Sequence, residues 1–480
     1  MQMKFFNKLL SFFLFIFLLK GYFSYIIIPF KTYHQEYKSS QNIAEDFLRE
    51  NINNTIYIEL EIGNPPQKIP GLIYSDEFGL FIINKKCKIP SNFKNIESSS
   101  TFVKSELHDN YTYKFRTQTD MLLGSEVFKF QINDKSTKQA IMDFMYSPNL
   151  NEQSSFKEEN AEKHFGDNNN YGYTCVGIGI RAELYLGNDY ESNFVRQLFY
   201  KEIVESNYFS IIYDEDSNDK GIFLIGVEPH IYDKDKYEEK RLRHINSRGH
   251  NFFIFWSLNP DRIFFKIDNK EINIPKNLVC SLEYSLGLIY GTKDYLDLIK
   301  QHYFDQLILE KKCHEEIVNS AYTVFYCYNK NDIKKFPSLN LFLQQFLFTF
   351  NLDYNDLFQE KNGKYFFKII FDKNNKMQWK LGKPFLKKYT LYYDYNAKTV
   401  GFYNQDPNKK SSKVWNVLLN IFFVIIIFIF GYVGFFYGKK AYDKVRKKRI
   451  YEIEDNYVYQ NQEQTQPKSN SMLEMMVKPK

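Results

Sequence analysis

The sequence has little of what metal, cofactor and nucleic-acid sites require. Its eight histidines show no metal-ligand spacing, and its 21 glycines form no phosphate-binding loop. The formal net charge is only +6 over 480 residues, and much of it comes from a Lys/Arg-rich segment near the C-terminus. Nucleic-acid binding therefore has no support. We expect no metal, no cofactor and no nucleic-acid partner.

Cysteine is scarce as well, with five residues in the chain. Cys313 and Cys327 bracket a short segment and are the best candidates for a disulfide in an oxidising compartment. Cys87, Cys175 and Cys280 cannot all pair with one another, so at least one thiol is left over.

Long apolar runs are found at the two ends of the chain. Residues 1–24 combine a basic start, an apolar stretch and small residues, which predicts a secretory signal peptide cleaved after Ser24. An uncleaved N-terminal anchor is the alternative. Residues 414–437 hold about twenty apolar residues without charge, enough to span a bilayer. Basic residues at 439–449 follow at once and predict a cytoplasmic tail over 438–480.

This topology predicts a single-pass type I membrane protein of the secretory pathway or cell surface. Its middle part is then luminal or extracellular, and we expect it to be monomeric. Asn53 and Asn110 each begin a glycosylation sequon on that side. The segment 451–480 is polar, and we expect it to lack regular structure.

The middle of the chain predicts an all-β fold with minor helices. Short strand-like runs separated by polar turns fill two stretches, which we interpret as an N-terminal lobe (54–232) and a C-terminal lobe (233–404). Residues 25–53 are polar, end in a helical pattern, and are expected to be a leader or linker. A surface loop is expected at 148–172, and a second linker at 405–413.

Several motifs occur in an order that resembles the pepsin-like aspartic proteases. Residues 55–68 (TIYIELEIGNPPQK) form a predicted hairpin, and residues 71–82 (GLIYSDEFGLFI) follow where the family has its first catalytic turn. Residues 175–180 (CVGIGI) resemble the strand behind that turn. The most specific match is the run WKLGKPFLKKYTLYYDYNAKTVGFY at 379–403.

The resemblance implies a bilobal pepsin-like fold with a cleft for an extended polypeptide. It also implies a flap over that cleft, carrying Tyr113. The family uses two aspartates, each in an Asp-Thr/Ser-Gly triplet, which share one proton over a water molecule. Lys383 stands where the family has an acidic residue.

The resemblance does not extend to the two catalytic triplets. A gap-free alignment of the two turns places Tyr74 and Cys280 at the aspartate positions, with the flanking hydroxyls kept as Ser75 and Ser281. Tyrosine and cysteine have ordinary pKa values near 10 and 8.5, so neither replaces a carboxylate. Both catalytic acids are then missing.

Displaced acids are the alternative at this site. Asp76 lies two residues along its strand, which moves a carboxylate by about 6 to 7 Å, and Glu283 lies three residues on. Proton transfer needs hydrogen-bond distance, so both turns would have to be rebuilt. Cys280 as a nucleophile would need a neighbouring histidine, and a buried structural thiol, or a disulfide with one of the spare cysteines, is favoured.

Three functions remain open from the sequence. The favoured hypothesis is a membrane-anchored pseudoprotease that binds a polypeptide in its interlobe cleft. The alternative is an active aspartic endopeptidase with a rearranged active site. A third option is a structural surface glycoprotein with no ligand in the cleft.

Overall fold

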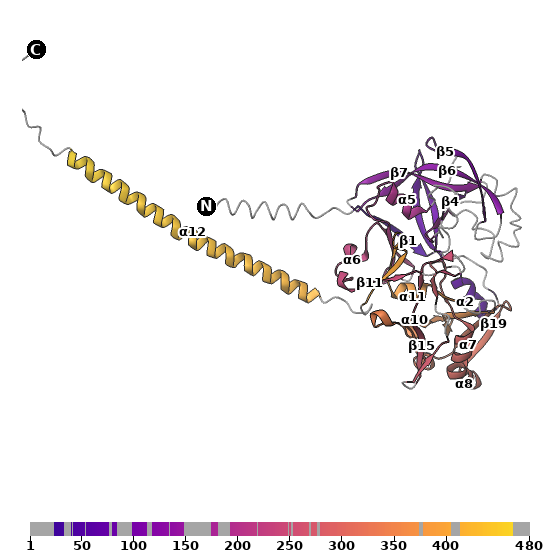
Figure 1. Cartoon of the computed structure of the whole chain (residues 1–480). Coiled ribbons are helices and arrows are strands. Elements are labelled where there is room, and N and C mark those ends of the chain that lie inside the picture. Colours follow the sequence, from indigo (N-terminus) through magenta and orange to yellow (C-terminus); the bar gives the residue numbers. More distant parts are fainter. Residues whose placement is uncertain are drawn as a thin grey trace, which may run out of the picture. The chain divides into compact units, whose positions relative to one another are not determined.

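The computed structural model describes residues 24–32, 40, 42–52, 54–75, 79–83, 98–112, 118–133, 135–147, 174–180, 193–217, 219–247, 249–250, 253–267, 270–275, 279–373, 378–404 and 413–463. The chain divides into two units, which are described separately. Met1–Lys409 contains a body rich in β-strands, and Lys410–Lys480 contains one long helix (Figure 1).

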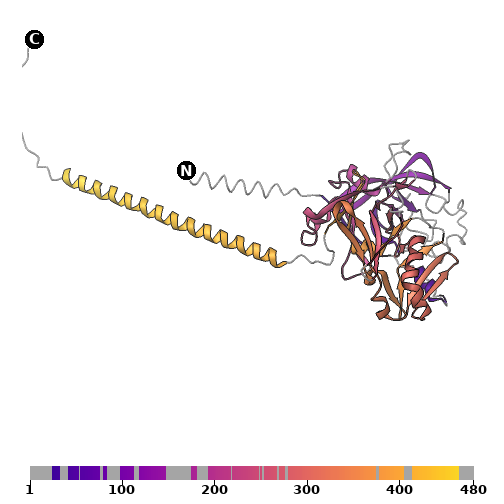
Figure 2. The ribbon, with the colours of Figure 1, turned by 60° about the horizontal axis from the view of Figure 1, so that its bottom comes forward.

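Within the described residues, the largest sheet has 13 strands and draws them from both halves of the sequence. Its order is β11-β28-β27-β9-β10-β1-β2-β3-β8-β4-β7-β6-β5. Strands from the end of the body thus lie beside β9, where orange and magenta ribbons meet in Figure 2. The bounds are β1 (Ile26–Thr32), β2 (Ile56–Ile62), β3 (Gln67–Tyr74), β4 (Leu80–Ile83), β5 (Val103–Thr112), β6 (Gln118–Gln131), β7 (Thr137–Ser147), β8 (Thr174–Gly177), β9 (Tyr208–Tyr213), β10 (Lys220–Ile225), β11 (Leu242–Asn246), β27 (Leu391–Asp394) and β28 (Thr399–Tyr403).

β2 and β3 form the hairpin that the alternating sequence predicts. Every second residue of β2, from Ile56 to Ile62, is buried, as expected for a strand with one core face. The turn between the strands starts at Gly63, whose φ of +81° suits glycine. β3 then pairs in parallel with β8, and its last four residues are all buried. This explains why its sequence becomes an apolar run instead of alternating.

β1 lies inside the sheet, hydrogen-bonded to β10 on one side and β2 on the other. Its buried residues alternate with more exposed ones, and Phe30 packs its ring 5.2 Å from that of Tyr213. A strand paired on both sides is not a linker, so the structure differs from our expectation for residues 25–53. The strand was missed because its partners are far away in the sequence.

The helix expected at the end of that segment is confirmed as α2 (Ile43–Ile52). Asn42 caps it, because its side-chain oxygen accepts hydrogen bonds from the backbone of Ala44 (2.8 Å) and Glu45 (3.1 Å). Phe47 stacks on Phe366 of the C-terminal half, with ring centroids 4.5 Å apart. α2 therefore packs as part of the body.

The other described sheets have nine, four and two strands. Their orders are β14-β17-β26-β18-β25-β20-β24-β23 with β19 attached to β20, then β16-β15-β21-β22, and β12-β13. The bounds are β12 (Gly249–His250), β13 (Phe253–Ile254), β14 (Ser257–Leu258), β15 (Arg262–Ile267), β16 (Lys270–Asn273), β17 (Cys280–Leu282), β18 (Ile289–Tyr290), β19 (Cys313–Val318), β20 (Tyr322–Cys327), β21 (Leu339–Leu343), β22 (Phe348–Leu352), β23 (Phe358–Lys361), β24 (Lys364–Phe367), β25 (Ile369–Asp372) and β26 (Trp379–Leu381).

Short helices join these strands. They are α5 (Phe194–Tyr200), α6 (Pro229–Tyr232), η3 (Glu239–Arg241), α7 (Lys293–Ile299), η4 (Lys300–Phe304), α8 (Asp305–Leu309), α9 (Lys330–Ile333), η5 (Gln344–Phe346), α10 (Tyr354–Leu357) and α11 (Lys383–Lys388). The predicted fold class, all-β with minor helices, is confirmed. The predicted disulfide is also present, since Cys313 and Cys327 lie opposite each other on β19 and β20 and are bonded.

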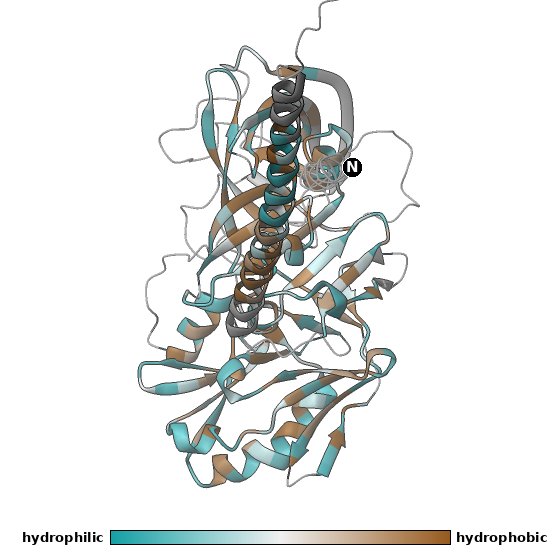
Figure 3. Cartoon of the chain, turned by 90° about the vertical axis from the view of Figure 1, so that its left-hand side faces the viewer, coloured by the Kyte–Doolittle hydropathy of each residue, from teal (hydrophilic) through white to brown (hydrophobic). Residues whose placement is uncertain are grey.

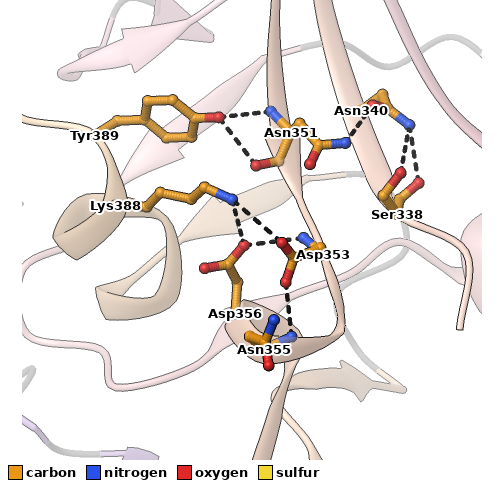
Figure 4. Close-up of polar contacts among 8 residues, drawn as sticks. All are labelled: Ser338, Asn340, Asn351, Asp353, Asn355, Asp356, Lys388 and Tyr389. Carbon is orange, nitrogen blue, oxygen red and sulfur yellow. Dashed lines mark hydrogen bonds and ion pairs between the residues drawn. The ribbon is translucent and has the colours of Figure 1, made fainter. Parts of the chain in front are cut away.

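A polar network holds α11 against α10 and β22 (Figure 4). Lys388 at the end of α11 forms an ion pair of 2.6 Å with Asp356, and Asp353 caps α10. The next residue, Tyr389, both donates to the carbonyl of Asn351 (2.9 Å) and accepts from its N–H (2.7 Å). The network thus anchors the part of the chain that carries the most specific sequence motif.

Replacing Lys388 by Met is expected to lower the free energy of unfolding by about 3 kcal/mol. The substitution leaves the Asp356 side chain, which is only 19% exposed, without its cation. Denaturation of the full chain in detergent would measure the loss. Lys293→Met is the control, because its pair with Asp297 is exposed and costs less than about 0.5 kcal/mol to remove. Equal losses in the two variants would contradict the prediction.

The second unit is helix α12 (Lys413–Glu463), 51 residues long. It is long and apolar enough to cross a membrane. Figure 3 shows an apolar stretch followed by a hydrophilic one along the helix. The helix continues to residue 463, so our expectation of irregular structure from residue 451 was wrong for its first part. The remainder, 464–480, lies outside the described residues.

Candidate functional site

Tyr74 is the last residue of β3, and its side chain is only 5% exposed. Its carbonyl oxygen accepts a hydrogen bond of 2.9 Å from the N–H of Ile178. Ser75 follows and is also buried. The pairing of β3 with β8 therefore fixes the backbone at the first candidate position.

Cys280 begins β17 and is completely buried. It pairs with Leu258 on one side and Trp379 on the other, and its thiol is free. Burial raises the pKa of this thiol well above its ordinary value, so the reactive thiolate is disfavoured. The structure supports the interpretation of Cys280 as a structural residue.

Glu283 follows β17 and meets Ser75, which is 208 residues away in the sequence. Ser75 Oγ donates to one carboxylate oxygen at 3.3 Å, and Ser281 Oγ donates to the other at 3.3 Å. Ser75 Oγ also accepts a hydrogen bond from the N–H of Tyr284 at 3.1 Å. The two predicted serines thus converge on one carboxylate, and Ser75 links the two halves of the body.

The strand pairs around these two turns follow the same pattern. In the first half, Val176 pairs with Ile73 in parallel and with Leu80 in antiparallel orientation. In the second half, Leu381 pairs with Leu282 in parallel and with Ile289 in antiparallel orientation. The two partners are seven residues apart in each case (80 − 73 and 289 − 282). A glycine follows the central residue each time, Gly177 or Gly382.

Comparison with known families gives one match across most of the body. The sequence model of the family described as "Eukaryotic aspartyl protease" matches residues 57–405. The chain belongs to the eukaryotic aspartyl protease family. Its pepsin-like fold has a cleft that could bind polypeptides. No curated protein sequence matches the chain significantly.

Solved structures confirm the pepsin-like fold of this aspartyl protease family member. Basic 7S globulin from soybean has 12% sequence identity and a TM-score of 0.54, covering 81% of this chain and 99% of its own. Conglutin gamma, a basic 7S globulin from lupine seeds, has 11% identity and a TM-score of 0.55, covering 82% and 98%. At these identities the likeness concerns the fold alone.

Some predicted site residues of this aspartyl protease homologue lie outside the described residues. They are Asp76, the flap residue Tyr113 and the sequon residue Asn53. Asn110 lies on β5, but its side chain is outside the described part. Among the residues that the structure does describe, no group of three or more His, Cys, Asp or Glu could hold a metal ion.

Two lysines near the site were not recognised as site residues. Lys380 lies between the buried Trp379 and Leu381, and its Nζ is 3.9 Å from Glu283. Lys383, where the family has an acidic residue, forms an ion pair of 3.0 Å with Asp219. The sequence did contain a signal for them, because these two lysines are the only charged residues in the otherwise apolar motif WKLGKPF.

Lys383 also ties the start of α11 to the N-terminal segment. Its amine donates to Thr32 of β1 and to Asn54, each at 3.3 Å. Desolvation lowers the pKa of this amine, and the ion pair with Asp219 opposes that shift. A substitution that removes the family's acid thus creates a contact between the two halves of this chain.

Buried tyrosines surround the carboxylate turn. Tyr284 and Tyr393 join their hydroxyls at 2.7 Å, and burial raises the pKa of both phenols. They are neutral hydrogen-bonding groups at any physiological pH. The contacts of Glu283 itself include the hydroxyls of Ser75 and Ser281, with Lys380 as the nearby cation.

Proposed function

We propose that this protein is a membrane-anchored, pepsin-like pseudoprotease that binds a polypeptide in its interlobe cleft. The single observation that carries the proposal is the contact between Ser75 and Glu283. It identifies the two turns that face each other across the halves of the body. One of these turns begins with a phenol at the position where the family has a carboxylate.

Glu283, and not Cys280, is proposed as the counterpart of Tyr74. The matching strand pairs support this equivalence, because Tyr74 follows Ile73 and Glu283 follows Leu282. It differs from the gap-free alignment, which gave Cys280. In this reading the second turn keeps an acid, lengthened by one methylene, and only the first turn has lost its acid.

One carboxylate does not make the family's catalytic pair. Two close carboxylates are needed to share a proton, so that one takes a proton from water as the other gives one to the peptide. A tyrosine with an ordinary pKa near 10 cannot take that proton at acidic pH. Tyr74 and Glu283 can instead hold a bound peptide through hydrogen bonds.

An active endopeptidase with a rearranged site is the second candidate. The observation in its favour is that Glu283 remains in contact with the hydroxyls of Ser75 and Ser281. Asp76 is the further acid that such a site would need. The proposal of a pseudoprotease assigns Asp76 no catalytic role.

A proteolysis assay separates these two candidates. The full chain in detergent, incubated at acidic pH with a peptide library, is expected to cleave none of the peptides. Some of the peptides are expected to bind the protein and to elute together with it from a size-exclusion column. Glu283→Gln is the control, since any true cleavage should disappear with this substitution. Cleavage that requires Glu283 and is blocked by a statine inhibitor would establish the endopeptidase instead.

The membrane anchor is proposed to be the apolar part of α12, with the body on the luminal or extracellular side. The apolar stretch supports spanning, and the basic residues at 439–449 support a cytoplasmic end. The disulfide between Cys313 and Cys327 fits an oxidising compartment for the body.

A further inference from the structure

Three residues from neighbouring strands form one polar row beside Glu283. Lys380 on β26 pairs in register with Ser281 on β17 and with Tyr290 on β18. Residues that pair in register point to the same face of a sheet. The neighbours Trp379 and Leu381 are buried on the opposite face, toward the core. Ser281, Lys380 and Tyr290 thus share the face on which Glu283 receives the hydroxyl of Ser281.

Within this group, Lys380 is the residue most open to a ligand. The side chain of Lys380 is 40% exposed, while that of Glu283 is 12% exposed. Glu283 already accepts hydrogen bonds from Ser75 and Ser281. The amine of Lys380 lies 3.9 Å from the nearer carboxylate oxygen, which is beyond hydrogen-bond distance. An ammonium has three donors, so Lys380 keeps hydrogen-bonding capacity for a partner.

At Tyr290 the row meets an apolar cluster to which the N-terminal helix α2 contributes. Tyr290 packs against the apolar cluster that contains Ile370 and the α2 residue Phe47. Tyr290 also bonds to Tyr322 through their hydroxyls, and burial raises its pKa. The row is therefore bounded by an apolar wall at Tyr290 and by the carboxylate turn at Glu283. Lys380 is the positive charge of this polar row.

We propose that Lys380 determines the specificity of the interlobe site by selecting polypeptides with an Asp or Glu side chain at the position facing it. This inference rests on the proposed polypeptide-binding function. The acidic group of the ligand would accept hydrogen bonds from Lys380 and replace its long contact with Glu283. A basic ligand side chain would be repelled by Lys380 more strongly than it is attracted by Glu283, because Glu283 is the less exposed of the two.

A charge-exchange experiment on the full chain in detergent tests the inference. The probe is a library of fluorescent decapeptides in which one position at a time is fixed as Glu, Gln or Lys. At the position facing Lys380, the wild type is expected to bind Glu peptides about tenfold more tightly than Lys peptides. Lys380→Met is expected to remove the preference, and Lys380→Glu to reverse it. The preference should also weaken at about 1 M salt.

Lys266→Glu is the matched control. Lys266 is also on a strand, half-exposed and paired with a glutamate, at 3.2 Å from Glu271. It should leave the peptide preference unchanged. Binding without charge preference, or the same preference in Lys380→Glu, would overturn the inference and leave the proposed function standing. Failure of every peptide to bind any variant would overturn both.

Discussion

Deletion of residues 25–32 is expected to prevent the β-rich body from folding. These residues contain β1, which fills the space between β10 and β2 in the largest sheet. Without it, two strands lose their hydrogen-bond partners, and the buried side chains of Ile26, Ile28 and Phe30 are lost from the core. Each such side chain contributes about 2 kcal/mol through burial alone. Their sum is comparable to the whole stability of a typical domain.

Single substitutions on the two faces of β1 make this expectation measurable. Phe30→Ala is expected to lower the free energy of unfolding by about 4 kcal/mol, because Phe30 is 3% exposed in the core. Lys31→Ala, one residue along and exposed, should change it by less than about 0.5 kcal/mol. Urea denaturation of the full chain in detergent gives both values. Similar small effects of the two substitutions would contradict the central place of β1.

The same strand predicts where the mature protein begins. If a signal peptide is removed after Ser24, the mature chain should keep residues 25–53 as part of its fold. N-terminal sequencing of the protein from secreting cells is expected to start near residue 25. A folded protein that starts at residue 54 would contradict this expectation.

Gly382→Ala is expected to cost at least about 4 kcal/mol or to leave no folded protein. A Cβ at Gly382 would lie 2.1 Å from the carbonyl oxygen of Leu288 and 2.3 Å from that of Leu286. Both are backbone atoms of the segment that follows Glu283, so relief requires the carboxylate turn to move. Circular dichroism and thermal unfolding of the full chain would measure the effect.

Gly363→Asn is the control for this substitution. Gly363 has a φ of +73° in a turn, and a Cβ there would meet nothing within 4 Å. Asparagine tolerates this backbone region better than most residues, so the cost should stay below about 1 kcal/mol. A mild effect at Gly382, equal to that at Gly363, would show that the turn is more adaptable than its close contacts indicate.

The sequence predicted the parts of the fold that depend on local pattern. The hairpin of β2 and β3, the helix α2 and the disulfide between Cys313 and Cys327 follow from alternation, a helical residue pattern and spacing. β1 was missed because a short strand gains its stability from β10 and β2, which no local pattern reveals. Propensity is a weak guide where distant pairing decides.

The candidate site also has one part that the local sequence predicts and another part that depends on distant strand pairing. Tyr74 and Ser75 were placed by the hairpin that precedes them, and their positions need no distant information. The second turn has neither the family's aspartate nor its glycine, and a serine at 281 made a gap-free alignment attractive. Its register depends on Leu381, which pairs with residues on both sides of Glu283. This pairing joins segments that are distant in the sequence, so only the structure reveals it.

The largest sheet combines strands from both halves of the sequence, and this affects how the protein folds during its synthesis. β9 has no strand partner on its outer side until β27 has been synthesised, and β11 has no strand partner in this sheet until β28 has been synthesised. β27 ends 19 residues before α12 starts (413 − 394), and β28 ends ten residues before it (413 − 403). A nascent chain therefore has an open sheet edge at β9 from residue 213 until β27 begins at residue 391, and such an edge invites aggregation. The sheet can be completed only after nearly all of the β-rich body has been synthesised, so we expect the open edge of β9 to need protection from aggregation during that interval.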